Sequence, residues 1–145
     1  MTIAAILGKK GAEVFSAQPG DRVSDVIMLL AQKRIGAVPV IDEGGVVGVF
    51  SERDVIRCLA DGIAAGAAAL DGPIRAVMTA PAVTVTPADT VIGALSLMSR
   101  RRIRHLPVVE QGRVTGMVSI GDLVKYRIDM IEADANAMRN YIQQA

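Results

Sequence analysis

The sequence contains almost none of the residues from which metal centres and nucleophilic active sites are commonly built. It has one cysteine, Cys58, and one histidine, His105. A lone thiol excludes an internal disulfide framework, and neither residue has partners at metal-ligand spacing. No Gly-x-x-x-x-Gly-Lys-Ser phosphate loop and no Gly-x-Ser-x-Gly nucleophile motif occurs. We therefore expect no metal and no enzymatic activity, with Cys58 serving as a small buried apolar residue.

Strong net charge and long apolar runs are also missing. Sixteen Lys and Arg residues against fifteen Asp and Glu residues leave a formal charge of +1, so no global field attracts nucleic acid or an anionic membrane. The apolar run from Ile3 to Leu7 is too short for a signal peptide, and no segment reaches the length of a membrane span. These features predict a cytoplasmic protein with neither a nucleic-acid nor a membrane partner.

The sequence does contain an internal repeat at a constant offset of 68 positions, for example from position 19 to position 87. Aromatic residues are scarce at 3% although 51% of residues are hydrophobic, so the core must be aliphatic, as in sheets covered by helices. The offset pairs identical residues without a gap: Pro19 with Pro87, Pro39 with Pro107, Gly48 with Gly116, Ser51 with Ser119, and Asp54 with Asp122.

Each copy follows the same pattern of predicted elements. A proline turn precedes an amphipathic helix, two short strands flank a glycine turn, and a second helix follows. A unit this small cannot cover its own sheet, so two copies should pack against each other. The predicted fold class is α/β, with two β-α-β-β-α repeats packed sheet to sheet about a pseudo-twofold axis. The predicted helices are Val23–Lys33 and Val91–Arg101, and the predicted hairpins are Ala37–Ile41 with Val46–Phe50 and Leu106–Val109 with Val114–Val118.

The repeat also predicts the domain boundaries. We expect an N-terminal helix over residues 1–12, a first copy with its connector over 13–72, a second copy over 73–127, and a C-terminal helix over 128–145. In that last helix Ile128, Ile131, Ala135, Met138 and Ile142 are spaced by three or four residues. Such a stripe can pack on its own domain or form a homodimer.

The motif Gly-x-x-Ser-x-x-Asp occurs in both copies where a strand passes into a helix, from Gly48 to Asp54 and from Gly116 to Asp122. Glycine allows close backbone approach, serine offers a hydroxyl beside free N–H groups, and the carboxylate can accept both hydroxyls of a ribose. The same spacing is also close to a helix capping box. The motif by itself leaves both interpretations open.

A second motif, Ile-x-x-h-Pro-Val with h apolar, spans Ile35 to Val40 and Ile103 to Val108. Together with the two Gly-x-x-Ser-x-x-Asp segments, and with Val77-Met78-Thr79 at the entry of the second copy, it resembles tandem CBS domains, named after cystathionine β-synthase. The resemblance covers nearly the whole chain.

The resemblance implies a module with two clefts that bind adenosine compounds. Asp54 and Asp122 would hold ribose, and Ser51 and Ser119 would lie near phosphate. The adenine pockets would be lined by the segments Phe15-Ser16-Ala17 and Val83-Thr84-Val85 and by apolar strand residues. The strand residues expected there are Ala37, Val38, Leu106 and Pro107.

The densest positive charge runs from Arg100 to His105. Arginine matches phosphate oxygens bidentately, whereas cations at a helix C-terminus are also stabilised by the helix dipole. We interpret Arg100 and Arg101 as solvated helix-end charges and Arg53, Arg104 and His105 as phosphate-facing. The counterparts of the latter three are Gly121, Gly36 and Ala37, so the two clefts should differ.

The favoured function is a regulatory sensor that binds AMP, ADP, ATP or NAD(H) and acts through an unidentified protein or through its own homodimer. One alternative is a structural interaction module in which the Ser and Asp residues only cap helices. The other is an enzyme acting on a nucleotide, supported only by the basic run beside Asp122.

Overall fold

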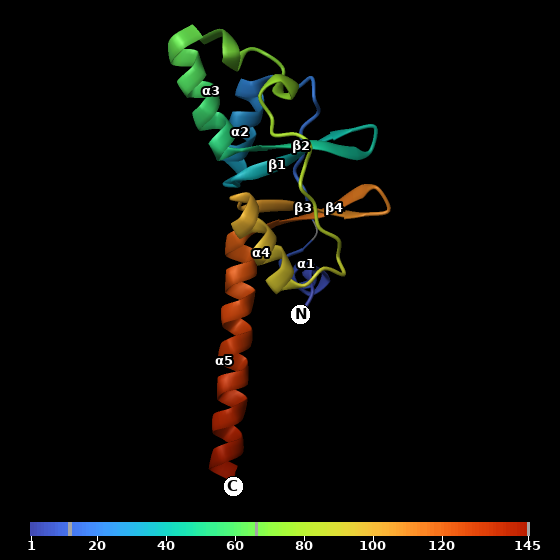
Figure 1. The fold of residues 1–145 in the computed structure, drawn as a ribbon, viewed down its shortest axis with the longest axis vertical. Helices are drawn as coiled ribbons and strands as arrows, with labels where there is room; N and C mark the ends of the chain where they lie inside the picture. The colour runs from blue at the N-terminus through green and yellow to red at the C-terminus, as the bar shows by residue number, and fades with distance from the viewer. Residues whose placement is uncertain (12, 66, 145) are drawn as a thin grey trace.

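The computed structural model describes residues 1–11, 13–65 and 67–144, without the side chains of residues 63–68. Two hairpins lie one above the other, with helices at their sides and one long helix leaving the body (Figure 1). The elements are α1 (Ile3–Lys10), α2 (Val23–Lys33), β1 (Ala37–Asp42), β2 (Gly45–Ser51), α3 (Glu52–Ala65), η1 (Ala67–Leu70), η2 (Ile74–Ala76), α4 (Val91–Arg101), β3 (His105–Glu110), β4 (Arg113–Ser119) and α5 (Ile120–Gln144).

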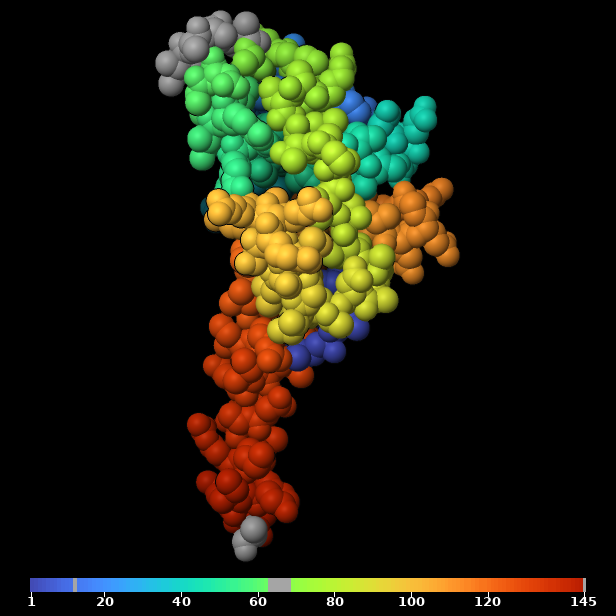
Figure 2. Space-filling view, in the orientation of Figure 1, coloured from blue at the N-terminus to red at the C-terminus, as the bar shows by residue number. Residues whose placement is uncertain are grey.

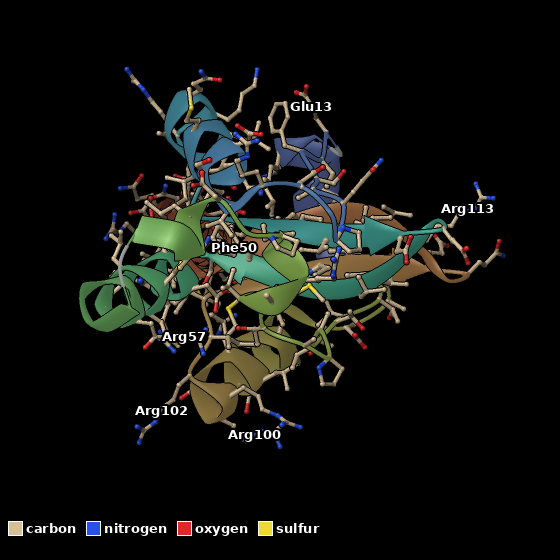
Figure 3. The ribbon with its side chains drawn as sticks, turned by 90° about the horizontal axis from the view of Figure 1, so that it is seen from above. Glu13, Phe50, Arg57, Arg100, Arg102 and Arg113 are labelled. Atoms are coloured by element: carbon tan, nitrogen blue, oxygen red, sulfur yellow. The ribbon has the colours of Figure 1, made fainter. Side chains whose placement is uncertain are left out.

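Both predicted hairpins are present, and they share one geometry. β1 pairs antiparallel with β2, and β3 pairs antiparallel with β4, with a register shift at Val40/Ile41 and at Val108/Val109. Each turn places two residues at positive φ, with Glu43 at 50° before Gly44 and Gln111 at 51° before Gly112. This is the turn that suits the right-handed twist of paired strands. Figure 3 shows the strands in projection from above, with Arg113 at the turn end.

The predicted first strand of each copy is reduced to a single parallel bridge. These bridges join Ala17 to Val40 and Val85 to Val108. They suffice to fix the incoming segment beside the hairpin, because Ala17 and Val85 are both buried there. The predicted α/β class with paired repeats is confirmed, with the first strand shorter than expected.

Helices α2 and α4 occupy the predicted residues. Val23, Val26 and Leu30 form the buried stripe of α2, and the equivalent stripe of α4 is Val91, Ala94 and Met98. Both helices end on an arginine in the left-handed region, Arg34 and Arg102, each with φ of 54°. This termination turns the chain at once into the following strand.

Each copy has its own core, built mainly from aliphatic side chains. Val38, Val40 and Phe50 are fully buried in the first, and Leu106, Val108 and Val118 are fully buried in the second. Cys58 is buried in the first core, as predicted. The hairpins meet between the two cores, where β2 contacts β4.

The two copies exchange their leading segments. Helix α1 precedes the first copy but packs in the core of the second, where Ile3 and Ile6 are buried. Residues 74–79 open the predicted second copy, yet Ile74 is buried in the first core. Backbone hydrogen bonds hold both segments in similar ways: Ile3 N donates to Asp89 O, and Ile74 N donates to Asp21 O. The predicted boundary at residue 73 therefore follows the repeat in the sequence. It does not separate the two cores, because each core includes a segment from the other side of that boundary.

The predicted C-terminal helix is not a separate element. Helix α5 runs without interruption from Ile120 to Gln144, because no glycine or proline follows Gly121 to end it. Leu123 is its one fully buried residue among those described. The C-terminal half extends away from the body (Figures 1 and 2).

Candidate functional site

The first cleft lies between the copies at the start of α3. It is a cavity of about 280 Å³ whose walls come from both copies. The first copy supplies Ser51, Arg53 and Asp54 from the strand-to-helix junction, and the second supplies Arg104 and His105. The remaining lining residues are Gly36, Val49, Glu52, Arg57, Thr79, Ala82, Val83, Arg101 and Ile103.

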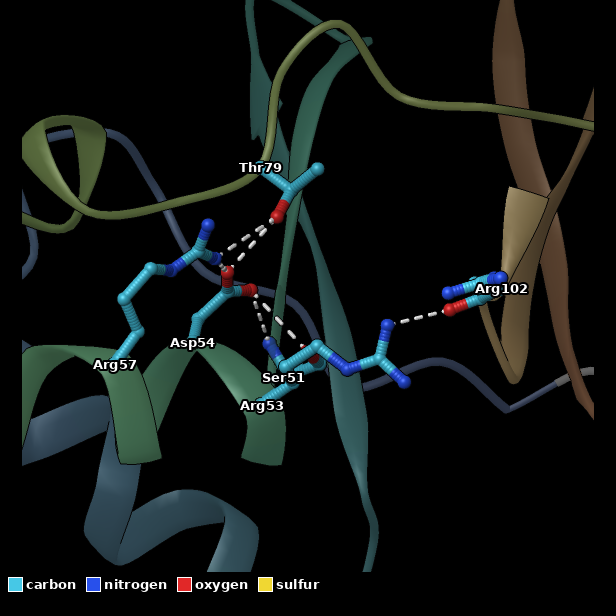
Figure 4. A network of polar contacts seen from close by, with 6 residues as sticks. All are labelled: Ser51, Arg53, Asp54, Arg57, Thr79 and Arg102. Carbon is cyan, nitrogen blue, oxygen red and sulfur yellow. Dashed lines mark hydrogen bonds and ion pairs between the residues drawn. The ribbon is translucent and has the colours of Figure 1, made fainter.

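Asp54 is the centre of a polar network in this cleft (Figure 4). Its side chain is 1% exposed, and it is the one buried charged residue within the described parts of the chain. The Ser51 backbone N–H and hydroxyl donate to Oδ2 at 2.9 and 3.2 Å. Thr79 Oγ1 donates to Oδ1 at 2.8 Å, and Arg57 forms an ion pair with the same oxygen. The carboxylate is thus fully satisfied and held rigidly.

The rest of the cleft is predominantly basic. Arg53, Arg57, Arg101 and Arg104 outnumber the acids Glu52 and Asp54. The Arg53 guanidinium donates to the Arg102 carbonyl oxygen, which bridges the two copies (Figure 4). This excess of positive side chains favours the binding of an anion in the cavity between the copies.

His105 lines both clefts. Its Cε1 and Nε2 lie 2.9 Å from the position that a Cβ on Gly36 would take, so the ring fills the space opposite that glycine. Burial lowers the pKa of His105 below its ordinary value of 6.5; Arg104 and Lys10 add to the lowering, whereas Glu52 and Asp122 oppose it. The imidazole is therefore neutral at pH 7 and can donate from one nitrogen and accept at the other.

The second cleft, of about 420 Å³, surrounds Ser119 and Asp122. Lys10 from α1 fills part of it, with Nζ 2.6 Å from Asp122 Oδ2 and 2.7 Å from the Met117 carbonyl oxygen. Burial would raise the pKa of Asp122, but hydrogen bonds from Lys10 and Ser119 outweigh it and hold that pKa below its usual 3.8. The charged lining residues are Lys10, Arg34, Glu13 and Asp122, an even balance.

The second serine–aspartate pair forms both capping contacts that the motif allows, and the first pair forms one of them. Ser119 N donates to Asp122 Oδ2 at 2.8 Å, and Asp122 N donates back to Ser119 Oγ at 3.1 Å. That reciprocal pair is a capping box with aspartate in place of glutamate. In the first copy only the bond from Ser51 N to Asp54 Oδ2 is present, because the Ser51 hydroxyl itself donates to Asp54. The motif therefore forms a full capping box at α5 and half of one at α3, while it also faces a cleft.

The motif glycines make room for the chain itself. A Cβ on Gly48 would lie 2.7 Å from Met78 Sδ and 2.9 Å from Thr79 O, and one on Gly116 would lie 2.7 Å from the Leu7 side chain. The exchanged segments thus lie against both glycines, with the Thr79 backbone at Gly48 and the Leu7 side chain at Gly116.

The structure brings together most, but not all, of the predicted site residues. Ser51, Arg53, Asp54, Val83, Arg104 and His105 line the first cleft, and Ala37, His105, Ser119 and Asp122 line the second. Among the residues described, five predicted ones line neither cavity. Val38, Leu106 and Pro107 are buried, the first two in the cores, and Ser16 and Thr84 are exposed. Successive side chains of a strand point to opposite faces, so Val38 points away from the cleft that its neighbour Ala37 lines.

Several lining residues escaped the sequence analysis. Arg57 follows Asp54 by three positions on α3, which is a helical neighbour spacing that could have been noticed. Thr79 and Lys10 reach the aspartates from the exchanged segments, and no local pattern indicates that. Arg101, interpreted as a solvated charge, lines the first cleft although it is exposed.

Two further findings concern the described residues. They contain no group of three or more His, Cys, Asp or Glu side chains arranged to hold a metal ion. No helix among them combines the length and the apolar character needed to span a membrane.

The chain was compared with known proteins. It is 30% identical over 135 residues to the CBS domain-containing protein YhcV of Bacillus subtilis, covering 91% of each. It is 33% identical over 128 residues to the mitochondrial CBS domain-containing protein CBSX3 of Arabidopsis thaliana, but these are 85% of this chain and 61% of CBSX3.

Solved structures show the same fold. The CBS-domain containing protein ATU1752 from Agrobacterium tumefaciens superposes with a TM-score of 0.82 at 35% identity, over 88% of this chain and 99% of that one. The CBS domain pair of MJ0100, solved with 5′-methylthioadenosine and S-adenosyl-L-methionine, gives a TM-score of 0.78 at 23% identity, over 90% and 98%. The family model of the CBS domain matches residues 11–61 and again residues 74–129. The chain therefore belongs to the CBS-domain family and carries two CBS domains.

Proposed function

We propose that this CBS pair is a regulatory module that binds an adenine nucleotide in the first cleft. The observation that carries the proposal is the composition of that cleft, where a buried, hydrogen-bonded Asp54 and the Ser51 hydroxyl face basic side chains from the opposite copy. Its volume of about 280 Å³ is near the lower end of ligand pockets, roughly 300 Å³.

Phosphate is the group that the cleft suits best. Arg53 lies in the first turn of α3, where free N–H groups and the helix dipole favour an anion. Arg104, the residue before β3, approaches from the other copy. Two guanidinium groups from opposite copies can therefore grip one phosphate, and that grip ties the copies together.

Ribose recognition requires a change in the Asp54 network. Both carboxylate oxygens already accept two hydrogen bonds each, which matches their capacity. Arg57 is the partner that can leave, because its side chain is 57% exposed. A ribose hydroxyl would replace it on Oδ1 and release that guanidinium toward phosphate.

The adenine would lie against the apolar part of the cleft, which Val49, Val83 and Ile103 form. The MJ0100 pair holds two adenosine compounds, so the fold accommodates an adenosine group. The equivalent apolar residues of the second cleft are Met117, Phe15 and Ile35. A second, less anionic ligand there is consistent with its even charge balance.

The test is calorimetric titration and thermal unfolding with AMP, ADP, ATP and NADH. A ligand at 100 times its dissociation constant should raise the free energy of unfolding by about 2.7 kcal/mol. Arg104→Ala should weaken binding of the phosphorylated ligands about tenfold or more. Arg113→Ala is the matched control, since Arg113 lies at the turn end of β4 (Figure 3) and should leave affinity unchanged.

Two results would contradict the proposal. One is the absence of binding across the panel at millimolar concentrations. The other is equal affinity of wild type and Arg104→Ala, which would place any bound nucleotide outside the first cleft.

The second candidate function is an interaction module without a ligand. The reciprocal hydrogen bonds of Ser119 with Asp122 favour it, because they account for the motif by capping alone. It predicts no thermal shift with any nucleotide, so the same titrations distinguish the two functions.

We infer that this module acts through a protein partner or through its own homodimer. We propose no catalytic activity, because the cleft residues are assigned to binding and capping. Incubation with ATP or NADH should return intact nucleotide. The cytoplasmic location stays a prediction.

A further inference from the structure

An exposed apolar stripe runs along α5 from Val124 to Ile142. Val124, Ile128, Ile131, Met138 and Ile142 are between 42% and 65% exposed, and Ala135 lies between them in the same series. Figures 1 and 2 show the C-terminal half of α5 standing clear of the body. The stripe therefore does not pack on its own domain, which was one of the two interpretations left open.

The stripe follows a heptad repeat. Its members alternate spacings of four and three, which places Ile128, Ala135 and Ile142 at a positions and Val124, Ile131 and Met138 at d positions. The mean spacing of 3.5 residues is that of a left-handed coiled coil. The series spans about 27 Å of helix at 1.5 Å per residue.

The flanking charges distinguish the two possible orientations of a partner helix. In a parallel pair a g residue faces the e residue five positions later on the partner. Arg127 at g then meets Glu132 at e, and Asp134 at g meets Arg139 at e. Both contacts join opposite charges, and each occurs twice in a symmetric dimer.

An antiparallel pair brings like charges together. There e faces e and g faces g, so with all six apolar layers matched Glu132 meets Glu132, Asp134 meets Asp134, and Lys125 meets Arg139. Like charges across an interface repel, so these contacts disfavour the antiparallel orientation.

We propose that α5 forms a parallel, in-register coiled coil with α5 of a second copy of this chain. The occupant of the stripe is a second copy because the charge pattern is self-complementary in one orientation only. A twofold axis along α5 then places both CBS pairs at the same end of the coiled coil. This interface does not depend on the ligand or on either cleft.

Sedimentation equilibrium of the full chain tests the dimer. We expect wild type to be dimeric at low micromolar concentration and Ile131→Asp to be monomeric. Ala133→Asp is the matched control, because it adds the same charge on the opposite, f, face of α5 and should stay dimeric. A monomeric or trimeric wild type, or a dimeric Ile131→Asp, overturns the proposal. Ile56→Asp on α3, an exposed apolar residue, should stay dimeric, and a monomer there instead would place the interface on the body.

Charge reversal and cross-linking test the orientation. Arg127→Glu should raise the dimer dissociation constant about tenfold, and adding Glu132→Arg in the same chain should restore it. Ile142→Cys should form a disulfide-linked dimer on oxidation, because a positions face each other in register, while Cys58 is buried. The parallel arrangement is overturned if Glu132→Arg does not restore the dissociation constant. It is also overturned if a disulfide forms only between Ile142→Cys and Val124→Cys chains.

Discussion

Lys10 Nζ lies 2.6 Å from Asp122 Oδ2, across 112 positions of sequence. The contact ties the end of α1 to the start of α5 and places a cation beside the aspartate of the second cleft. In the first cleft the equivalent aspartate, Asp54, is paired with Arg57 of its own helix. The equivalent aspartates of the two clefts are thus paired with cations from different parts of the chain.

Removing that cation should have a modest effect on stability. Lys10→Met should lower the free energy of unfolding by about 0.5–1 kcal/mol, because both side chains of the ion pair are partly exposed, 37% and 26%. Chemical denaturation at neutral pH measures it. Lys125→Met, an exposed lysine on α5, is the control and should change stability less.

The same pair predicts acid dependence. The pKa of Asp122 lies below 3.8 in the folded protein, so its contribution to stability is present above that pH and is lost as the pH falls through the folded pKa. The difference in unfolding free energy between wild type and Asp122→Asn should be constant near neutrality and shrink below about pH 4. A difference that grows on acidification would contradict this assignment.

His105 should make the fold less stable below pH 6.5. Because burial lowers the pKa of His105 in the folded state, the unfolded chain takes up the proton first on acidification. The free energy of unfolding should therefore fall between pH 6.5 and the lower folded pKa. His105→Gln should lose that part of the pH dependence.

The chain has a single histidine, so its Cε1 proton is assignable directly by NMR titration. A phosphorylated ligand in the first cleft should raise the pKa of His105, because a phosphate beside Arg104 and His105 favours the charged ring. A ligand that binds without moving that pKa would lie elsewhere.

Gly48→Ala should be clearly destabilising. The new Cβ would meet Met78 Sδ at 2.7 Å and the Thr79 carbonyl oxygen at 2.9 Å, and backbone cannot withdraw without disturbing Thr79 and its bond to Asp54. We expect a loss of about 1–3 kcal/mol in thermal or urea unfolding. Gly62→Ala in α3 meets nothing within 4 Å and should be neutral or stabilising by up to about 1 kcal/mol.

Asp54→Asn should cost more stability than Asp122→Asn. Asp54 is fully buried and accepts hydrogen bonds from Ser51 and Thr79 as well as an ion pair, and an amide cannot satisfy all these donors. We expect a loss of about 2–4 kcal/mol for Asp54→Asn and less for Asp122→Asn. Equal losses in urea denaturation would show that burial of Asp54 does not strengthen its network.

Much of the fold was predictable because the repeat and its periodicity are local signals. Val23–Lys33 and Val91–Arg101 form helices as predicted, and glycine at the turns indicated both hairpins. The extent of α5 was missed, because a helix boundary was placed at residue 128 where no residue ends a helix.

The sites were less predictable, because their walls come from distant segments. The resemblance located Ser51, Asp54, Ser119 and Asp122, whereas Thr79 and Lys10 reach these aspartates through the exchange of leading segments. Nothing in the sequence near either residue shows that packing. Whether these residues bind a ligand stays a prediction.

The exchange of leading segments also bears on how the chain folds. A cut in the connector between the copies would leave α1 on one fragment and Ile74 on the other, each needed in the opposite core. The fragments would complement each other in solution, and neither would hold a complete core alone. In the uncut chain the two halves are obliged to fold together, so unfolding should be a single cooperative transition despite the duplication.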